Sequence, residues 1–272
     1  DSMQVYRYLD IGTAKPTVAE RRLIPHHLID CVDPDEEFNA ARFLEAADRV
    51  IAARHREGKN IFVVGGTGLY IRVLLGGLLP GPEPDAALRK YYRDLMNRRG
   101  REYLHALLKS RDAAAAQAIE ANDAVRIIRA LEYLAVTGRS ITAGQERHGF
   151  QEQRYEAIKI GLCTDRPALM NRIERRAAAM IAAGIVEETR AILARGYPGD
   201  LKPMQSLGYK HICAYLEGRS TLEEAQDAMT RDTRKYAKRQ LTWFKAEKDM
   251  IWMSPDDLPG IRRLIKEFLP TR

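Results

Sequence analysis

One segment constrains the fold more than any other: Ile61-Phe62-Val63-Val64-Gly65-Gly66-Thr67-Gly68-Leu69-Tyr70. The apolar run predicts a buried strand over 60–64. The glycines permit a tight turn and a close backbone approach, and the spacing after Thr67 predicts a helix. Such turns bind ligands at the carboxyl ends of strands, where a helix start favours an anion. We therefore predict a phosphate-like group near 65–68, and a turn without ligand is the alternative.

The composition is that of a globular protein with an excess of positive charge. The 272 residues are 45% hydrophobic and 30% charged, and the net charge is +7. This excess suits a polyanionic partner, although many enzymes are moderately basic. No apolar run approaches the roughly 20 residues that span a bilayer, so we expect no membrane partner. Cys31, Cys163 and Cys213 are far apart in sequence, which fits a reducing cytoplasm.

The first third of the chain has the pattern of a βαβ unit. A short strand is predicted at 26–30, and a helix with the N-cap Asn39 and its end at Gly58 follows. The strand over 60–64 completes the unit, so its crossover should be right-handed and the strands parallel. The two histidines at 26–27 have no further ligand at metal spacing, so we assign them no metal.

A helical insertion is predicted next. Pro80-Gly81-Pro82-Glu83-Pro84 marks a boundary. No strand pattern appears between Asp85 and about Gly144. The predicted domains are 83–147, an all-helical insertion, and 1–82 with 148–272, an α/β core.

The last part of the chain returns to mixed elements. The predicted strands are 155–163 and 250–253. The predicted helices start at Asp165, at 185 and at a Ser220–Glu223 capping box, and a terminal helix spans 258–269. Residues 203–210 are predicted to be a loop.

Two groups of cationic residues are candidates for anion binding. Arg172 and Arg176 are four residues apart and so share a helix face that can clamp a phosphate. The alternative is that they are exposed and pair with Glu174 or with solvent. The helix that ends near Phe244 carries a basic face beside Trp243, which suits a phosphate backbone or is simply solvated.

Six blocks, in order along the chain, resemble those of bacterial tRNA dimethylallyltransferases, also called tRNA isopentenyltransferases. The blocks are Asp1-Ser2-Met3-Gln4-Val5-Tyr6-Arg7, Asp10-Ile11-Gly12-Thr13-Ala14-Lys15-Pro16, Val64-Gly65-Gly66-Thr67-Gly68-Leu69-Tyr70, Arg126-Ile127-Ile128-Arg129-Ala130-Leu131-Glu132, Gln205-Ser206-Leu207-Gly208-Tyr209 and Lys238-Arg239-Gln240-Leu241-Thr242-Trp243-Phe244. Together they extend over essentially the whole chain.

The resemblance implies an α/β fold with a P-loop NTPase-like parallel-sheet core and an all-helical insertion that grips the tRNA anticodon stem-loop. It implies transfer of a dimethylallyl group from dimethylallyl diphosphate to N6 of the adenosine 3′ of the anticodon. It also implies a cytoplasmic monomer that uses Mg²⁺. The family's GPTxSGKS/T loop is absent from this sequence. We therefore expect a segment ahead of Asp1 to supply the diphosphate cradle and the Mg²⁺ ligand.

The resemblance also assigns residues to roles. Asp1 is the expected general base. Thr67 and Arg176, with Arg172 second, are expected at the diphosphate. The expected tRNA contacts are Asp1, Ser2, Met3, Gln4, Thr67, Arg89, Val125, Arg126, Ile127, Ile128, Arg129, Met204, Gln205, Ser206, Leu207, Gly208, Tyr209, Lys238, Arg239, Gln240, Leu241, Thr242, Trp243, Phe244 and Lys245.

Two other functions stay open at this point. A small-molecule P-loop kinase would share the core and a helical lid, although the long basic helix near the C-terminus argues against it. A tRNA-binding fragment without activity is the second alternative.

Overall fold

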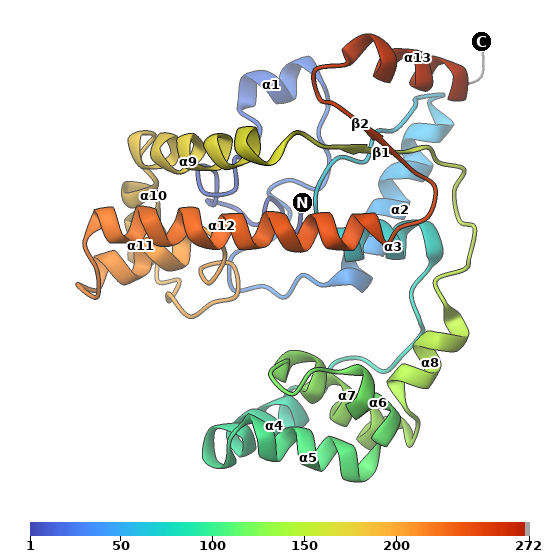
Figure 1. Cartoon of the computed structure of the whole chain (residues 1–272), viewed down its shortest axis with the longest axis vertical. Helices are drawn as coiled ribbons and strands as arrows, with labels where there is room; N and C mark the ends of the chain where they lie inside the picture. Colours follow the sequence, from blue (N-terminus) through green and yellow to red (C-terminus); the bar gives the residue numbers. More distant parts are fainter. Residues whose placement is uncertain (270–272) are drawn as a thin grey trace. The chain divides into compact units, whose positions relative to one another are not determined.

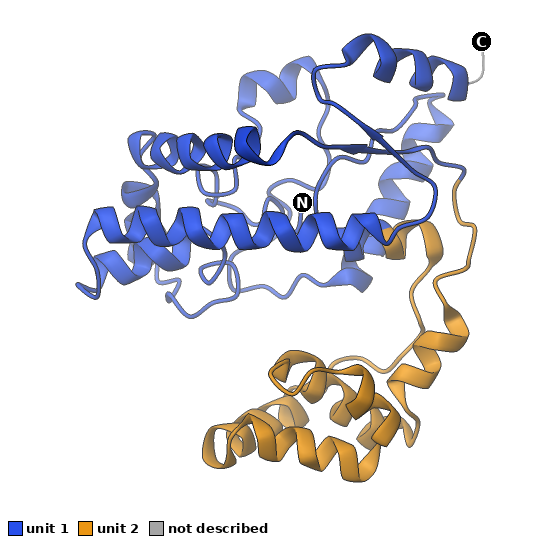
Figure 2. Ribbon diagram, in the orientation of Figure 1, with its two compact units in different colours: residues 1–71, 156–272 blue, residues 72–155 orange. Residues whose placement is uncertain are grey.

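The computed structural model describes residues 1–269, and the chain forms two compact units. Unit 1 comprises Asp1–Ile71 and Glu156–Arg272, and unit 2 comprises Arg72–Tyr155 (Figure 2). The helical insertion predicted at 83–147 lies within unit 2, which begins earlier and ends later.

Unit 2 is built from helices. They are α4 (Ala86–Arg99), α5 (Arg101–Arg111), α6 (Ala113–Ala118), α7 (Ala124–Thr137) and α8 (Ile141–His148). Asp85 accepts a hydrogen bond from the backbone of Leu88 and Asp123 one from Arg126, so both act as N-caps. The apolar side chains of these helices meet in one core, which includes Tyr92, Leu104, Leu108, Ile127 and Leu131.

Unit 1 combines helices with a small sheet (Figure 1). Its helices are α1 (Val18–Leu23), α2 (Ala40–Arg56), α9 (Arg166–Ala182), α10 (Ile185–Ala194), α11 (Tyr209–Leu216), α12 (Leu222–Lys245) and α13 (Leu258–Phe268), and α3 (Gly68–Gly76) begins in it. The long helix α12 packs against α9 and α11.

The sheet has two parallel strands, β1 (Lys159–Leu162) and β2 (Met250–Met253). Both lie where the sequence predicted strands. The predicted strands at 26–30 and 60–64 are wrong for this structure, because neither segment has a strand assignment. A strand needs a hydrogen-bonding neighbour, and the sheet of the described residues contains only β1 and β2. Val64 is 83% exposed. The predicted βαβ unit is therefore not formed among residues 1–269.

Two predicted boundaries shift on the folded chain. The capping box that opens α12 pairs Thr221 with Glu224, one residue later than predicted from Ser220. The helix α11 begins at Tyr209, inside the predicted loop 203–210. Burial of Tyr209 and of three further α11 side chains favours the helix here, a tertiary effect that local turn residues do not signal.

A buried lysine fixes the N-terminal loop of unit 1. The Lys15 ammonium donates to the carbonyl oxygen of Tyr6 at 2.9 Å and to carboxylate oxygens of Asp10 and Asp30, each at 2.6 Å. Its side chain is only 1% exposed. These bonds tie the segment around Tyr6 and Asp10 to the segment that contains Asp30.

No helix in the described part of the chain is both long and apolar enough to cross a membrane.

Candidate active site

The glycine turn, residues 65–68, ends an extended segment and starts α3. The Thr67 carbonyl oxygen accepts from the backbone of Tyr70 at 2.9 Å, which closes the first turn of the helix. Tyr70 stacks on Phe43 of α2 with ring centroids 4.3 Å apart. Burial raises the pKa of Tyr70 to about 12, so this hydroxyl stays protonated and anchors the turn as a core residue.

The Thr67 hydroxyl lies beside the first residues of the chain. It accepts from the Ser2 backbone at 3.3 Å and donates to the Ser2 hydroxyl at 3.2 Å. Asp1, the preceding residue, accepts from the backbone of Met3 at 2.7 Å through Oδ1. The carboxylate and the hydroxyl that were predicted from separate blocks therefore lie on two adjoining segments.

The side-chain amide of Gln4, in the same N-terminal segment, is held in one orientation by hydrogen bonds. Its Nε2 donates to the carbonyl oxygens of Thr13 and Ala14 at 3.0 and 3.1 Å. Because both partners are acceptors, the amide nitrogen must face them and the amide oxygen must face away. Gln4 therefore offers an acceptor to a bound partner.

A carboxylate that the sequence analysis did not single out holds the same loop from the other side. Glu188 of α10 accepts from the backbones of Asp10, Ile11 and Gly12 at 2.9 to 3.4 Å. The Tyr209 hydroxyl donates to Glu188 at 2.5 Å, and burial is the main cause that raises the pKa of this tyrosine. A Cβ on Gly12 would overlap the Tyr209 ring, so this glycine provides space.

Several residues of the predicted tRNA-binding set are buried. The side chains of Met204 and Tyr209 are fully buried, and Gly208 is buried as well. Ile127 and Ile128 are buried in the core of unit 2. These side chains support the fold in this conformation, and the predicted contacts of these residues with tRNA stay predictions. Gln205, Ser206 and Leu207 keep exposed or half-buried surface.

The predicted basic face of α12 is accessible. A hollow of about 480 Å³ runs along the helix, and its lining residues are Lys235, Lys238, Arg239, Thr242 and Trp243. Lys238, Arg239 and Lys245 are exposed, and the Arg239 guanidinium lies over the Tyr236 ring at 5.6 Å. Cations beside aromatic rings suit a nucleic acid backbone and its bases.

Gln240 lies against the glycine turn and not in that hollow. Its amide nitrogen donates to the Gly66 carbonyl oxygen at 2.9 Å. Leu241 and Phe244 are half-buried on the same helix.

Arg172 and Arg176 are exposed on α9. Neither arginine pairs with Glu174 among the described residues, because Glu174 accepts from Arg234 of α12 at 3.1 Å. The exposed arginines fit the part of the alternative in which they face solvent. No contact between these arginines and the glycine turn is present among the described residues, so their role at the diphosphate stays a prediction.

Two arginines of unit 2 that are expected to contact RNA form ion pairs with a buried carboxylate. Glu132 is fully buried, and it pairs with Arg89 at 2.9 Å and with Arg129 at 2.7 Å. It also accepts from the Asp85 backbone at 2.7 Å, so it fixes the start of α4 against α7. Val125 and Arg126, in contrast, are exposed at the start of α7.

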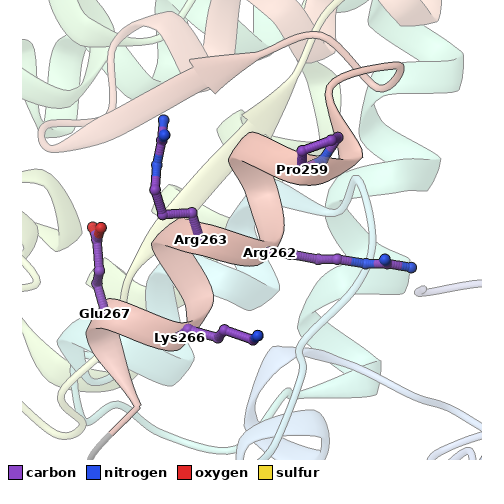
Figure 3. A pocket seen from close by; sticks show the side chains of 5 residues that line it. All are labelled: Pro259, Arg262, Arg263, Lys266 and Glu267. Carbon is purple, nitrogen blue, oxygen red and sulfur yellow. The ribbon is translucent and has the colours of Figure 1, made fainter.

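A second basic hollow lies on α13, and its lining residues are Pro259, Arg262, Arg263, Lys266 and Glu267. Figure 3 shows that Arg263 and Glu267 extend to one side of the helix while Arg262 and Lys266 extend to the other. The groups do not converge, so we assign no ligand to this surface.

Within residues 1–269, no three His, Cys, Asp or Glu side chains form a group that could hold a metal ion. Of the oxygen donors at the glycine turn, only Asp1 carries a charge, and a single carboxylate is a poor set for Mg²⁺ without further ligands. The described residues therefore do not fit the expected ion by themselves.

Comparisons with known proteins agree with the geometry. A model of the IPP transferase family matches residues 4–247. A protein of Syntrophus aciditrophicus, tRNA dimethylallyltransferase 2, is 51% identical over 269 residues, which cover 99% of this chain and 86% of that protein. The tRNA dimethylallyltransferase of Geobacter metallireducens is 49% identical over 260 residues, which cover 96% and 83% of the two chains.

Solved structures give the same result. The full-length tRNA isopentenylpyrophosphate transferase of Bacillus halodurans has a TM-score of 0.70 and 38% identity, with 98% of this chain and 86% of that chain covered. A eukaryotic dimethylallyltransferase acting on tRNA has a TM-score of 0.76 and 26% identity, with 97% and 70% covered. The class of protein is thus an enzyme that transfers a prenyl group. Within that class, the chain belongs to the IPP transferase family.

Proposed function

We infer that this chain transfers a dimethylallyl group to tRNA. The observation that carries the conclusion is the 51% identity to a tRNA dimethylallyltransferase over 99% of the chain. The site supports it, because a carboxylate and a hydroxyl adjoin and a basic, aromatic helix face lies on α12. The match over 4–247 also disfavours a small-molecule kinase.

The donor is dimethylallyl diphosphate, and the acceptor is N6 of the adenosine 3′ of the anticodon. Adenine N6 is a weak nucleophile because its lone pair is delocalised into the ring. The Asp1 carboxylate takes a proton from N6 while the bond from N6 to C1 of the allyl group forms. The bond from C1 to the diphosphate oxygen breaks, and the diphosphate leaves with the electron pair.

Asp1 is suited to this proton transfer. Its Oδ1 accepts from the Met3 backbone, which fixes the direction of the carboxylate. Its Oδ2 has no hydrogen bond to another described residue, so this oxygen is open to a substrate proton.

The diphosphate needs donors and cations at its oxygens as charge develops. Thr67 supplies a hydroxyl next to Asp1, and Arg176, with Arg172 second, supplies charge from the exposed face of α9. An Mg²⁺ ion would need ligands beyond the described set, and no step above uses one.

The reacting base must leave the helical stack to reach a carboxylate. Lys238, Arg239 and Lys245 of α12 and Arg126 of unit 2 hold the RNA backbone in this proposal, because all four are exposed cations. The parallel pair β1–β2 supports a P-loop NTPase-like core. We also propose a cytoplasmic monomer, which the three unpaired cysteines suit.

An assay with labelled dimethylallyl diphosphate and unmodified tRNA tests this function in the full-length protein. Label in the tRNA is expected. Phosphorylation of a small molecule by ATP would instead support the kinase, and a gel shift without label in the tRNA would support a binding protein without activity.

A further inference from the structure

The glycines of the turn have a neighbour that the sequence did not reveal. A Cβ on Gly66 would overlap the Gln240 amide, and a Cβ on Gly68 would overlap the Trp243 indole. Gln240 and Trp243 are three residues apart, so they share one face of α12. Neither glycine has a positive φ. Gly68 therefore provides space for the indole ring, and the amide at the end of the flexible Gln240 side chain occupies the space beside Gly66.

The contact includes a directed hydrogen bond. The Gln240 amide nitrogen donates to the Gly66 carbonyl oxygen at 2.9 Å. Because the partner is an acceptor, the orientation of the amide is fixed by chemistry. The side chain is half-buried, so this donor is engaged with the protein backbone and is not presented to solvent.

The glycine turn connects the contact with Gln240 to the Thr67 hydroxyl and, through Ser2, to Asp1. Thr67 lies between the two glycines, and its hydroxyl is bonded to both the backbone and the hydroxyl of Ser2. Asp1 directly precedes Ser2 in the chain. The position of α12 therefore fixes the Thr67 hydroxyl relative to the Asp1 carboxylate through one short set of contacts.

We propose that Gln240 is a positioning residue for prenyl transfer, which holds the glycine turn so that Thr67 stays at the diphosphate. The proposal rests on the role proposed above for Thr67. It replaces the expectation that Gln240 contacts tRNA. It also gives α12 two functions, since Lys238 and Arg239 face the RNA while Gln240 faces the turn.

The variant Gln240→Glu tests this in the full-length enzyme. A carboxylate keeps the shape of the amide but cannot donate to the Gly66 carbonyl oxygen. Displacement of a reacting group by about 1 Å costs on the order of 100-fold in rate. We expect kcat to fall about 10- to 100-fold while KM for tRNA changes less than about 3-fold. Gln226→Glu makes the same chemical change near the other end of α12 and should leave both constants unaltered.

A double-mutant cycle with Thr67→Ala separates positioning from other effects. If Gln240 acts through Thr67, Gln240→Glu should cost little more once Thr67 is already Ala. Equal losses in both backgrounds, or a loss confined to KM for tRNA, would overturn the proposal. Gln240→Met removes the donor without adding a charge, so it keeps the test available if Gln240→Glu folds poorly. Its loss in kcat should likewise be smaller once Thr67 is already Ala.

The cycle also distinguishes a failure of the role proposed for Thr67 from a failure of the role proposed for Gln240. If Thr67→Ala alone has no effect on kcat, the role of Thr67 in the proposed reaction fails. If Thr67→Ala slows the reaction and the two losses are additive, Thr67 stands and only the positioning role of Gln240 fails.

Discussion

A buried ammonium group and a half-buried carboxylate hold the loop that precedes α1. Lys15 binds Asp10 and Asp30 from one side, and Glu188 receives three backbone N–H groups of the loop from the other. Burial raises the pKa of Asp30, but Lys15 and Arg21 more than offset this, so the pKa lies below its ordinary value. These contacts fix the loop whose carbonyl oxygens orient Gln4, the residue directly before the first buried core residue, Val5.

Replacing Lys15 by Met should destabilise unit 1. The change removes three hydrogen bonds of an ammonium group that is 1% exposed. Both carboxylates keep some contact with water, so we expect a loss of about 2 to 3 kcal/mol in the free energy of unfolding. Urea unfolding followed by tryptophan fluorescence measures it, because Trp243 and Trp252 both lie in unit 1.

Lys59→Met is the matched control for Lys15, since Lys59 is exposed. A loss in Lys15→Met no larger than in this control would show that the buried network contributes nothing to stability.

At the scale of elements, the junction of α11 with α12 sets where the basic helix lies. His211 is buried, its Nδ1 accepts from the Gly208 backbone at 3.4 Å, and its Nε2 lies 3.3 Å from Asp232 of α12. Lys210 also pairs with Asp232 at 2.6 Å. Burial lowers the pKa of His211, and the adjacent Lys210 adds to this, although Asp232 acts in the opposite direction.

This junction predicts a dependence of stability on pH. The folded pKa of His211 lies below its ordinary value, so the unfolded chain binds a proton first as the pH falls through about 6.5. Stability should therefore decrease as the pH falls from 7.5 to 5.5. Urea titrations at both values should show a smaller decrease in His211→Gln than in the unaltered protein or in His55→Gln, an exposed control. Equal decreases in all three would contradict the assignment.

The basic face of α12 makes a separate prediction about salt. Lys238→Ala with Arg239→Ala should weaken tRNA binding and reduce the slope of log affinity against log salt by about 1.4 to 1.8, since each phosphate contact contributes roughly 0.7 to 0.9. Filter binding over a range of salt measures this. Arg56→Ala with Lys59→Ala removes the same charge from the exposed end of α2. If the slope is unchanged by the α12 pair, that face is only solvated.

Local sequence patterns correctly predicted features, such as helix caps, whose hydrogen-bond partners are close in sequence. The caps Asn39 and Asp165 are where the sequence placed them, because each bonds to its own first turn. The segment 60–64 was wrong as a strand because pairing depends on a neighbour and not on its own residues. The helix α11 was missed in its first turn for the same reason.

For the whole molecule, the family resemblance predicted the class of enzyme, and the comparisons confirm it. Spacing alone could not separate residues that contact a substrate from residues that support them. Tyr209 lies in a matching block and Met204 directly before it, yet both are buried, while Glu132 and Glu188 bind partners distant in sequence, Arg89 and Tyr209. A single sequence contains no distances, so such pairs emerge only from the folded chain.

In the proposed mechanism, prenyl transfer to tRNA depends on the carboxylate next to the glycine turn. The most direct test replaces Asp1 by Asn in the full-length enzyme, which keeps the shape and removes the basic oxygen. Single-turnover transfer of label from dimethylallyl diphosphate to tRNA should fall by at least about 100-fold, the range expected for a lost general base. The affinity for tRNA should stay within about 3-fold. Transfer at an undiminished rate by Asp1→Asn would contradict the account.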